Sequence, residues 1–282
     1  MPDPGGEAKC AQFPGKYSPK KRMRGEDMKI AFFDSGVGGV TVLAEAVKLL
    51  PKADYIYYAD TLHVPYGPKP KADVKSYIAE AAAYLAGCGI DALVVACNTA
   101  TSVAIQTLRQ TYAFPVIGME PAVKPAVANS GGGRRVLVLA TALTLQETKF
   151  RDLVSQVDHE HVVDSLPMPE LVEFAEKLIV DEAAVVPCLQ QKFAGLDLAA
   201  YGTVVLGCTH FAFFRGSLRR VLAPGTDIID GTEGTLRHLL HKLEETGLAP
   251  GGDGGICFFA SGGEADAARL QQAFRIARGL AD

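Results

Sequence analysis

No apolar run in the 282-residue sequence approaches the roughly 20 residues that a membrane-spanning helix needs. The N-terminus also lacks the apolar core of a secretory signal peptide. We therefore expect no membrane anchor and no secretion, and we predict a cytoplasmic protein. The net charge of −4 gives no general electrostatic reason to expect nucleic acid or a membrane as a partner.

The sequence contains no CxxC pair and no HExxH motif, the arrangements that would favour a zinc site. It is also too long and too apolar for a small scaffold stapled by disulfides. We therefore predict reduced thiols at the six scattered cysteines, which are Cys10, Cys88, Cys97, Cys188, Cys208 and Cys257.

The composition is that of an ordinary globular protein, with 48% hydrophobic and 21% charged residues. A chain of this length can form one large domain or two of ordinary size. Residues 1–27 are rich in proline and glycine, end in a basic cluster and lack apolar periodicity. We predict that this stretch is a disordered or loosely attached extension. It could have a role of its own, and the equal alternatives are an unstructured leader without a role and a wrongly assigned start, with Met28 as the true one.

From Met28 onward, short apolar runs alternate with stretches of helical periodicity. Such alternation predicts an α/β fold with parallel sheets flanked by helices, in which ligands bind beyond the carboxyl ends of the strands. The predicted strands are residues 28–33, 54–59, 91–97, 114–118, 135–140, 201–208, 227–230 and 255–260.

The pattern begins again halfway along the chain. When Ala140 is aligned with Asp34, the distances along the sequence to Cys208 and to Cys97 are similar. This repeat predicts two pseudo-symmetric halves.

Two of the predicted strands end at a cysteine that is followed by small polar residues. Cys97 precedes an asparagine and a threonine, whereas Cys208 precedes a threonine and then His210, an imidazole that can stabilise a thiolate or transfer a proton. Matched strand ends would face each other across a cleft. This geometry suits two acid/base groups on opposite sides of one carbon atom.

Other interpretations remain open at this point. A cysteine hydrolase would use Cys208 with His210 but would leave Cys97 unexplained. A protein that closes two lobes on a small anionic ligand fits the architecture but does not require thiols. The glycine-rich segment 34–39 lacks the spacing of a dinucleotide fingerprint and the P-loop lysine, so it favours a tight strand-to-helix turn.

Four motifs in register resemble the cofactor-independent Asp/Glu racemase family, and glutamate racemases in particular. They are FDSGVGG at 33–39, DTLHVPYG at 60–67, ACNTA at 96–100 and GCTHF at 207–211. The chain departs from the family in carrying Ala212, Phe213 and Phe214 where a proline usually follows. This difference predicts a reshaped wall of the cleft.

The resemblance implies two α/β lobes with the active site in the cleft between them. The first lobe would contain residues 28–119 and 231–282, and the second would contain residues 120–230. It also implies that the enzyme interconverts L- and D-glutamate without a cofactor or a metal, with aspartate as the alternative substrate. D-glutamate would then enter peptidoglycan synthesis, and so cell-wall biogenesis and cell shape.

By resemblance, Cys97 would remove the α-proton from D-glutamate while Cys208 protonates the opposite face, and the roles would exchange for L-glutamate. Removal and return of a proton on opposite faces requires two bases. Asp34 and His210 would assist the thiols, as would Glu173. The substrate would be held by Asp34, Ser35, Tyr66, Gly67, Asn98, Thr99 and Thr209.

The resemblance also suggests partners besides the substrate. A homodimer is expected for the family. Some members carry an N-terminal extension and respond to a peptidoglycan precursor as an activator, which makes residues 1–27 a candidate for the same role.

Overall fold

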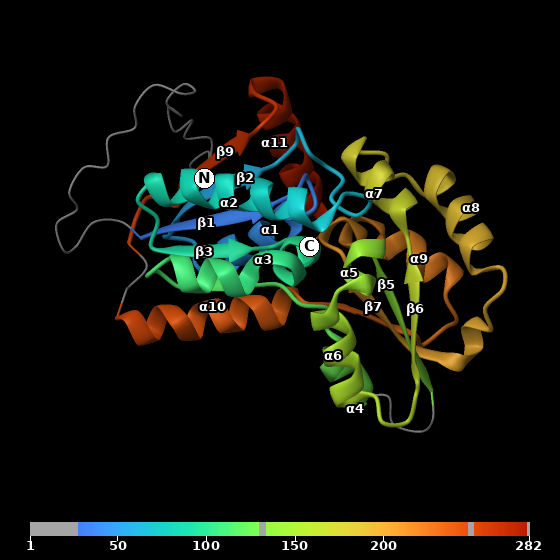
Figure 1. The fold of residues 1–282 in the computed structure, drawn as a ribbon. Coiled ribbons are helices and arrows are strands. Elements are labelled where there is room, and N and C mark those ends of the chain that lie inside the picture. The colour runs from blue at the N-terminus through green and yellow to red at the C-terminus, as the bar shows by residue number, and fades with distance from the viewer. Residues whose placement is uncertain (1–27, 130–133, 248–250, 281–282) are drawn as a thin grey trace.

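The computed structural model describes residues 28–129, 134–247 and 251–280. The predicted N-terminal extension, residues 1–27, lies outside these ranges. Figure 1 shows two sheets side by side, each with its own helices. None of the helices in the described ranges has both the length and the apolar character needed to cross a bilayer.

The first sheet has the strand order β4-β3-β1-β2-β9, and every neighbouring pair is parallel. Its central strands are buried on both faces, which explains their nearly continuous apolar sequences. The strands are β1 (Lys29–Asp34), β2 (Asp54–Ala59), β3 (Ala92–Val95), β4 (Val116–Gly118) and β9 (Ile256–Ala260).

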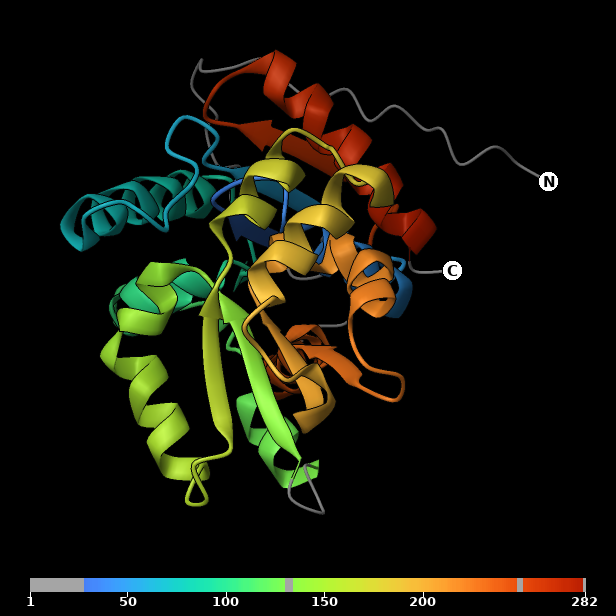
Figure 2. The ribbon, with the colours of Figure 1, turned by 90° about the vertical axis from the view of Figure 1, so that its right-hand side faces the viewer.

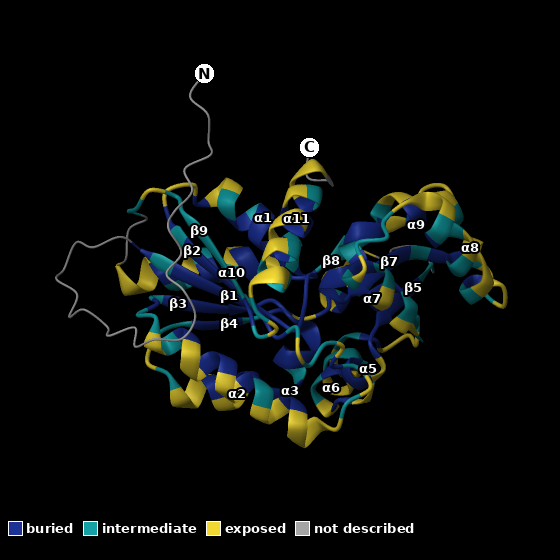
Figure 3. Cartoon of the chain, turned by 90° about the horizontal axis from the view of Figure 1, so that it is seen from above, coloured by how far each residue is buried: buried dark blue, intermediate teal, exposed yellow. Residues whose placement is uncertain are grey.

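Helices cover both faces of this sheet, because successive strand residues point to opposite sides. Ile30 and Phe32 of β1 pack with α1 (Val40–Leu49), α10 (Thr232–Thr246) and α11 (Glu264–Leu280). Ala31 and Phe33 pack instead with α2 (Lys71–Gly87) and α3 (Asn98–Thr111). Figure 3 shows the buried strands between α1 and α11 on one side and α2 and α3 on the other.

The second sheet has the order β6-β5-β7-β8 and is also parallel throughout. Its strands are β5 (Arg135–Ala140), β6 (Val163–Pro167), β7 (Tyr201–Gly207) and β8 (Asp227–Asp230). Its helical segments are α4 (Val123–Asn129), α5 (Ala142–Gln146), α6 (Thr148–Val157), α7 (Pro169–Glu176), α8 (Glu182–Phe193) and α9 (Arg215–Val221), with 3₁₀ turns η1 (Leu198–Ala200) and η2 (Thr209–Phe214).

The two sheets repeat one topology. The order β4-β3-β1-β2 in the first corresponds to β8-β7-β5-β6 in the second, so β1 matches β5 and β3 matches β7. This confirms the pseudo-symmetric halves and the α/β fold class predicted from the sequence. The sequence analysis missed β6, because this edge strand is only partly buried and lacks an apolar run.

The chain passes between the sheets at two adjacent points. A Cβ atom on Gly231 would collide with the carbonyl oxygen of Glu120, so the two connecting segments touch and glycine is needed there. The residue bounds of the two lobes remain a prediction. The carboxyl ends of β1, β3, β5 and β7 face the space between the sheets, where the loops that bear Cys97 and Cys208 meet.

Candidate active site

A cavity of about 320 Å³ lies between the two sheets and contains both predicted thiols. Cys97 reaches it from the first sheet and Cys208 from the second. The fourteen lining residues therefore come from both halves: Ser35, Pro65, Tyr66, Gly67, Pro68, Cys97, Thr99, Thr141, Ala142, Pro169, Val172, Glu173, Cys208 and His210.

Cys97 stands between β3 and α3, where it caps the helix. Its Sγ accepts a hydrogen bond from the backbone N–H of Ala100 at 3.4 Å and donates to Oγ of Ser35 at 3.7 Å. Burial raises the pKa of the Cys97 thiol, and the nearby carboxyl of Asp34 raises it further. Both effects favour the neutral thiol form of Cys97.

Cys208 follows β7 directly and lies beside an imidazole. Its Sγ is 3.6 Å from Nδ1 of His210, and Nε2 of the same ring is 2.6 Å from Oε1 of Glu176. Burial acts to lower the pKa of His210, but Cys208 and Glu176 outweigh it, so this pKa is raised well above its ordinary value. A charged ring donates from both nitrogens, to the sulfur and to the carboxylate.

Glu176 is the carboxylate bonded to His210, and the sequence analysis did not select it. The predicted helper Glu173 lines the cavity one turn earlier on α7. The two glutamates are three residues apart and share one face of the helix. The sequence therefore signals a carboxylate on this face but does not choose between the two.

Asp34, at the end of β1, is completely buried behind the cavity. Its Oδ1 accepts from the N–H of Gly36 at 3.1 Å and from Oγ of Ser35 at 3.3 Å, and its Oδ2 accepts from Oγ1 of Thr209 at 3.0 Å. Burial raises the pKa of Asp34, although His210 and these hydrogen bonds partly offset the rise. Thr209 thus connects the two halves of the site.

The glycines after Asp34 let the second half of the molecule approach. A Cβ on Gly36 would collide with Glu176, and one on Gly38 would lie 2.5 Å from Nδ1 of His210. The sequence predicts a turn here that lets backbone approach a ligand. The structure confirms the turn and shows that these glycines make room for side chains of the other sheet.

Tyr66 and Gly67 form the cavity wall supplied by the loop after β2. The Tyr66 hydroxyl donates to Oδ2 of Asp60 at 2.7 Å. Asp60 also accepts from Oγ of Ser261 at 2.9 Å and lies 2.8 Å from Nδ1 of His63. Asp60 therefore fixes the position of Tyr66, a role for which the sequence analysis did not select it.

Asn98 is 1% exposed, and neither atom of its amide group, Nδ2 or Oδ1, has a hydrogen-bond partner within the described part of the chain. Its neighbour Thr99 lines the cavity, and Oγ1 of Thr99 lies 2.9 Å from the hydroxyl of Thr141 and 3.1 Å from that of Thr144. Buried polar groups normally have partners. Asn98 is not among the fourteen lining residues, but its amide has hydrogen-bonding capacity left for a polar ligand.

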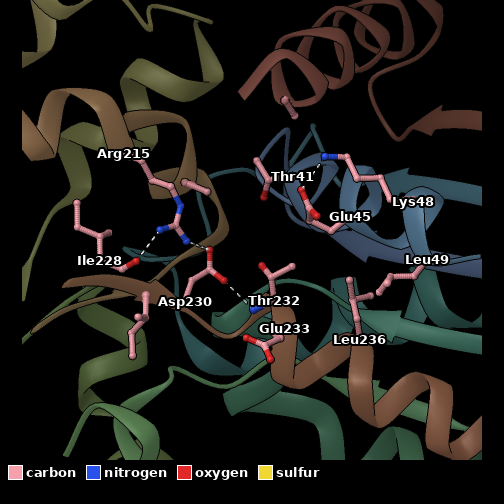
Figure 4. Close-up of a pocket in the computed structure, with 13 residues that line it drawn as sticks. Thr41, Glu45, Lys48, Leu49, Arg215, Ile228, Asp230, Thr232, Glu233 and Leu236 are labelled. Atoms are coloured by element: carbon pink, nitrogen blue, oxygen red, sulfur yellow. Dashed lines mark hydrogen bonds and ion pairs between the residues drawn. The ribbon is translucent and has the colours of Figure 1, made fainter. Parts of the chain in front are cut away.

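A larger cavity, of about 610 Å³, lies away from the thiols between α1, α9, β8 and α10 (Figure 4). Its polar groups already have partners: Arg215 donates to Oδ2 of Asp230 at 2.6 Å and to the carbonyl of Ile228 at 2.7 Å. Oδ1 of Asp230 in turn accepts from the N–H of Thr232. The smaller cavity, with two thiols and an imidazole, is the better candidate for catalysis.

The segment that departs from the family pattern lies outside the catalytic cavity. Phe213 and Phe214 are buried in the core, and Ala212 lines the larger cavity. None of these three residues is among the fourteen that line the catalytic cavity in the described chain. No cluster of three potential metal ligands occurs among the described residues either.

Comparison with known proteins places this site in a family. Residues 40–239 match the family model described as Asp/Glu/Hydantoin racemase. The chain is 54% identical to the glutamate racemase of Halothermothrix orenii over 246 residues, which cover 87% of this chain and 97% of the relative. It is 52% identical to glutamate racemase 2 of Bacillus subtilis over 236 residues, or 83% and 89% of the two chains.

Solved structures of glutamate racemases share the fold. The Escherichia coli enzyme, in complex with L-glutamate and the activator UDP-MurNAc-Ala, superposes with a TM-score of 0.79 at 29% identity over 89% of this chain and 96% of that one. The Thermus thermophilus enzyme, in complex with β-chloro-D-alanine, gives 0.73 at 32% identity over 88% and 94%. The chain therefore belongs to the Asp/Glu/hydantoin racemase family of isomerases, in which its relatives are glutamate racemases.

Proposed function

We propose that the protein interconverts L- and D-glutamate by a two-base mechanism in which Cys97 and Cys208 act on opposite faces of the α-carbon. The observation that carries this proposal is the placement of both thiols, from different sheets, in one cavity. One base suffices to remove a proton, but inversion requires a second group to return one from the other side. Glutamate as the substrate is supported by the similarity of the chain to glutamate racemases.

The surroundings of the two thiols support different starting states. The raised pKa of Cys97 favours its thiol form, whereas Nδ1 of His210 lies 3.6 Å from Sγ of Cys208 and can stabilise negative charge that develops on this sulfur. In this state Cys208 removes the α-proton of L-glutamate and Cys97 protonates the opposite face. The reverse reaction starts after Cys97 has lost its proton and Cys208 has gained one.

The substrate is held, in this proposal, by neutral donors and by the start of α3. Cys97 caps this fourteen-residue helix, so a carboxylate in the cavity would face its N-terminal amides. The unpartnered amide of Asn98 supplies a hydrogen bond at the same place. Ser35, Thr99 and the backbone of Gly67 complete the polar wall.

Asp34 and His210 assist the thiols, and Glu176 assists His210. Asp34 connects to Cys97 through the Ser35 hydroxyl. Thr209 stays hydrogen-bonded to Asp34 and acts through it. Glu173, which lines the cavity, is retained as a weaker helper because the carboxylate bonded to His210 belongs to Glu176.

The cellular proposal follows from the reaction. D-glutamate produced in the cytoplasm would supply peptidoglycan synthesis. The Escherichia coli structure contains a UDP-MurNAc-Ala activator, which supports testing a peptidoglycan precursor as an effector of this enzyme. The dimer expected for the family also remains a prediction, and light scattering of the purified protein would measure it.

Exchange of the α-hydrogen in deuterated water tests the reaction. The purified protein, with no cofactor added, should exchange the α-hydrogen of L-glutamate and of D-glutamate and should abolish optical rotation. L-aspartate, incubated in parallel, should exchange far more slowly. Absence of exchange with glutamate would contradict the proposal, and faster exchange with aspartate would reassign the substrate.

Alanine substitutions test the two bases. Cys97→Ala and Cys208→Ala should each lower racemisation by about 10³-fold or more, since a positioned acid/base group contributes about 10² to 10⁴. Cys88→Ala is the matched control, because Cys88 lies outside the cavity and donates to the carbonyl of Tyr84. Unchanged racemisation in either cavity variant would disprove the two-base assignment, whereas hydrolysis that depends on Cys208 alone would favour a hydrolase.

A further inference from the structure

Glu176 and Arg269 form an ion pair across the two halves of the molecule, and each has a buried atom without a hydrogen-bond partner in the described chain. Oε1 of Glu176 accepts from the N–H of Val37 at 2.9 Å and contacts His210. Its Oε2, and Nε of Arg269, are buried and have no hydrogen-bond partner within the described chain. Nη2 of Arg269 lies 3.7 Å from Oε2 of Glu176 and 3.5 Å from Oδ1 of Asp266.

The position of Glu176 in the fold disfavours an isolated negative charge, so a nearby cation stabilises its carboxylate. Glu176 is the last residue of α7, where the helix dipole is negative and disfavours another negative charge. Its side chain is only 12% exposed, so water screens it poorly. His210 neutralises one oxygen, and Arg269 is the cation paired with the other.

The pair also joins the two halves. Arg269 lies on α11, the C-terminal helix, which packs on β9 of the first sheet and on α1. Glu176 lies on α7, which follows β6 of the second sheet. Figure 2 shows the yellow α7 beside the red α11.

We propose that Arg269 is a positioning residue that holds the Glu176 carboxylate against His210, and thereby favours the thiolate of Cys208. The inference rests on the proposed two-base function and extends it to the C-terminal helix, which contributes no residue to the cavity lining. Arg269 touches neither thiol and acts through Glu176.

Other charged and titratable groups face this cluster from every packed element. They are Asp34 on β1, Tyr57 on β2, Cys97 before α3, Cys208 after β7 and Asp266 on α11. Each of these groups is neutral when protonated and negatively charged when ionised, so none of them supplies a positive charge. Loss of the Arg269 charge therefore makes the cluster more negative, and it also releases the carboxylate that orients His210. Both effects disfavour the thiolate of Cys208.

Alkylation of Cys208 measures this effect without reference to racemase activity. In a Cys97→Ala background, iodoacetamide labelling of Cys208 is followed against pH by mass spectrometry of its peptide. Arg269→Gln should move the midpoint of the labelling curve to higher pH by about half a unit, the scale of a partly exposed ion pair. Arg269→Lys, which keeps the charge, should return the midpoint most of the way to its value in the parent protein.

The matched control is Arg275→Gln, a change of the same chemistry at an exposed position of the same helix. It should leave the labelling curve unchanged. Melting temperatures of all variants show whether a shift reflects unfolding. Curves for Arg269→Gln and the parent that coincide would overturn the inference, as would an equal shift in Arg275→Gln.

Kinetics then connect the pair to the reaction. Arg269→Gln should lower kcat/KM by about 3- to 10-fold and move the acidic limb of its pH profile upward. In a Glu176→Gln background the same change should have little further effect, because the carboxylate that it serves is gone. Additive losses would contradict an action through Glu176.

The two hypotheses fail separately. If the wild-type enzyme racemises glutamate but Arg269→Gln behaves like it in both assays, the Arg269 inference is wrong and the proposed function stands. If the wild-type enzyme does not exchange the α-hydrogen, the proposed function is wrong, and the labelling curve still decides whether Arg269 acts on Cys208.

Discussion

Glu176 accepts the Nε2 hydrogen of His210 at 2.6 Å, and this contact joins the end of α7 to the segment that follows β7. The other ring nitrogen faces Cys208 at 3.6 Å. One imidazole therefore connects a buried carboxylate to a thiol in the cavity. Burial acts to lower the pKa of the ring, but Cys208 and Glu176 outweigh it and raise this pKa, which favours the cationic imidazolium.

Glu176→Gln should reduce kcat/KM more than Glu173→Gln. A hydrogen bond to a charged group contributes about 1.5 to 3 kcal/mol, which corresponds to roughly a 10- to 100-fold loss. Glu173 has no such contact with His210, so its substitution should cost less than about 5-fold, as expected for a weakly coupled charge. Circular dichroism of the glutamate enantiomers provides the rates, and the reverse order of effects would restore Glu173 as the principal helper.

Gly38→Ala should impair catalysis by obstructing the approach of the two sheets. The new Cβ would lie 2.5 Å from Nδ1 of His210 and 2.7 Å from the backbone nitrogen of the same residue. Overpacking of this kind costs about 1 to 3 kcal/mol, and the displaced ring would reduce kcat by about 10-fold or more. Steady-state kinetics and thermal denaturation measure the two effects.

Gly87→Ala is the control for that substitution. Gly87 is the last residue of α2, and nothing lies within 4 Å of a Cβ placed there. Alanine should leave kcat unchanged and stabilise the helix by up to about 1 kcal/mol. Equal kinetic losses in both variants would show that the loss does not arise from the contact with His210.

Asn98→Leu should stabilise the empty protein and weaken substrate binding. The substitution removes two buried polar atoms that have no partner in the described chain, which relieves roughly 1 kcal/mol or more. It also removes the proposed contact with glutamate, so KM should rise by about 10-fold. Melting temperatures with and without glutamate test the predicted gain in stability and the predicted loss of binding. A variant that melts at a lower temperature and is still stabilised by glutamate would contradict the proposed role of Asn98.

Asp34→Asn should change the pH dependence of stability. The folded-state pKa of Asp34 is raised above its ordinary value of 3.8, so its contribution to stability is fully present below that pH and is lost as pH rises through the folded-state value. The variant cannot titrate at this position. Its unfolding free energy relative to wild type should therefore increase between about pH 4 and pH 6, below the range in which unfolded histidine titrates.

Urea unfolding at several pH values measures that difference. A constant offset between the two proteins would arise from the changed hydrogen bonds with Thr209 and Gly36, which do not depend on pH. Only the slope reports the titration of Asp34. A difference that falls as pH rises would show that the folded protein lowers this pKa.

Much of the fold could be predicted because its strands are buried on both faces. Residues 30–33 of β1 and 136–140 of β5 are all apolar, and the helices between the strands give the alternation of a parallel sheet. The edge strand Val163–Pro167 was missed for the opposite reason, since its side chains are mostly half-exposed and its sequence is mixed. The edge strands β4, β8 and β9 were predicted because each contains consecutive apolar residues, which β6 lacks.

The cavity was predictable to a similar extent. Cys97 and Cys208 each follow a strand and therefore lie at the carboxyl edge of their own parallel sheet, where ligands bind, and the motifs around them resemble those of the family. Asp60 was not selected, because its role depends on contacts with Tyr66 and Ser261 that the sequence separates by 6 and 201 residues. Long-range hydrogen bonds of this kind leave no local pattern.

The sequence by itself determined the two thiols, the strand ends that present them and the repeat that sets them opposite each other. Only the tertiary structure decided that Glu176 rather than Glu173 meets His210, and that the glycines after Asp34 approach the second sheet. Two carboxylates three residues apart occupy the same helical face, and local periodicity cannot distinguish them. The packing of α7 against η2, together with the approach of Arg269 from α11, makes that choice.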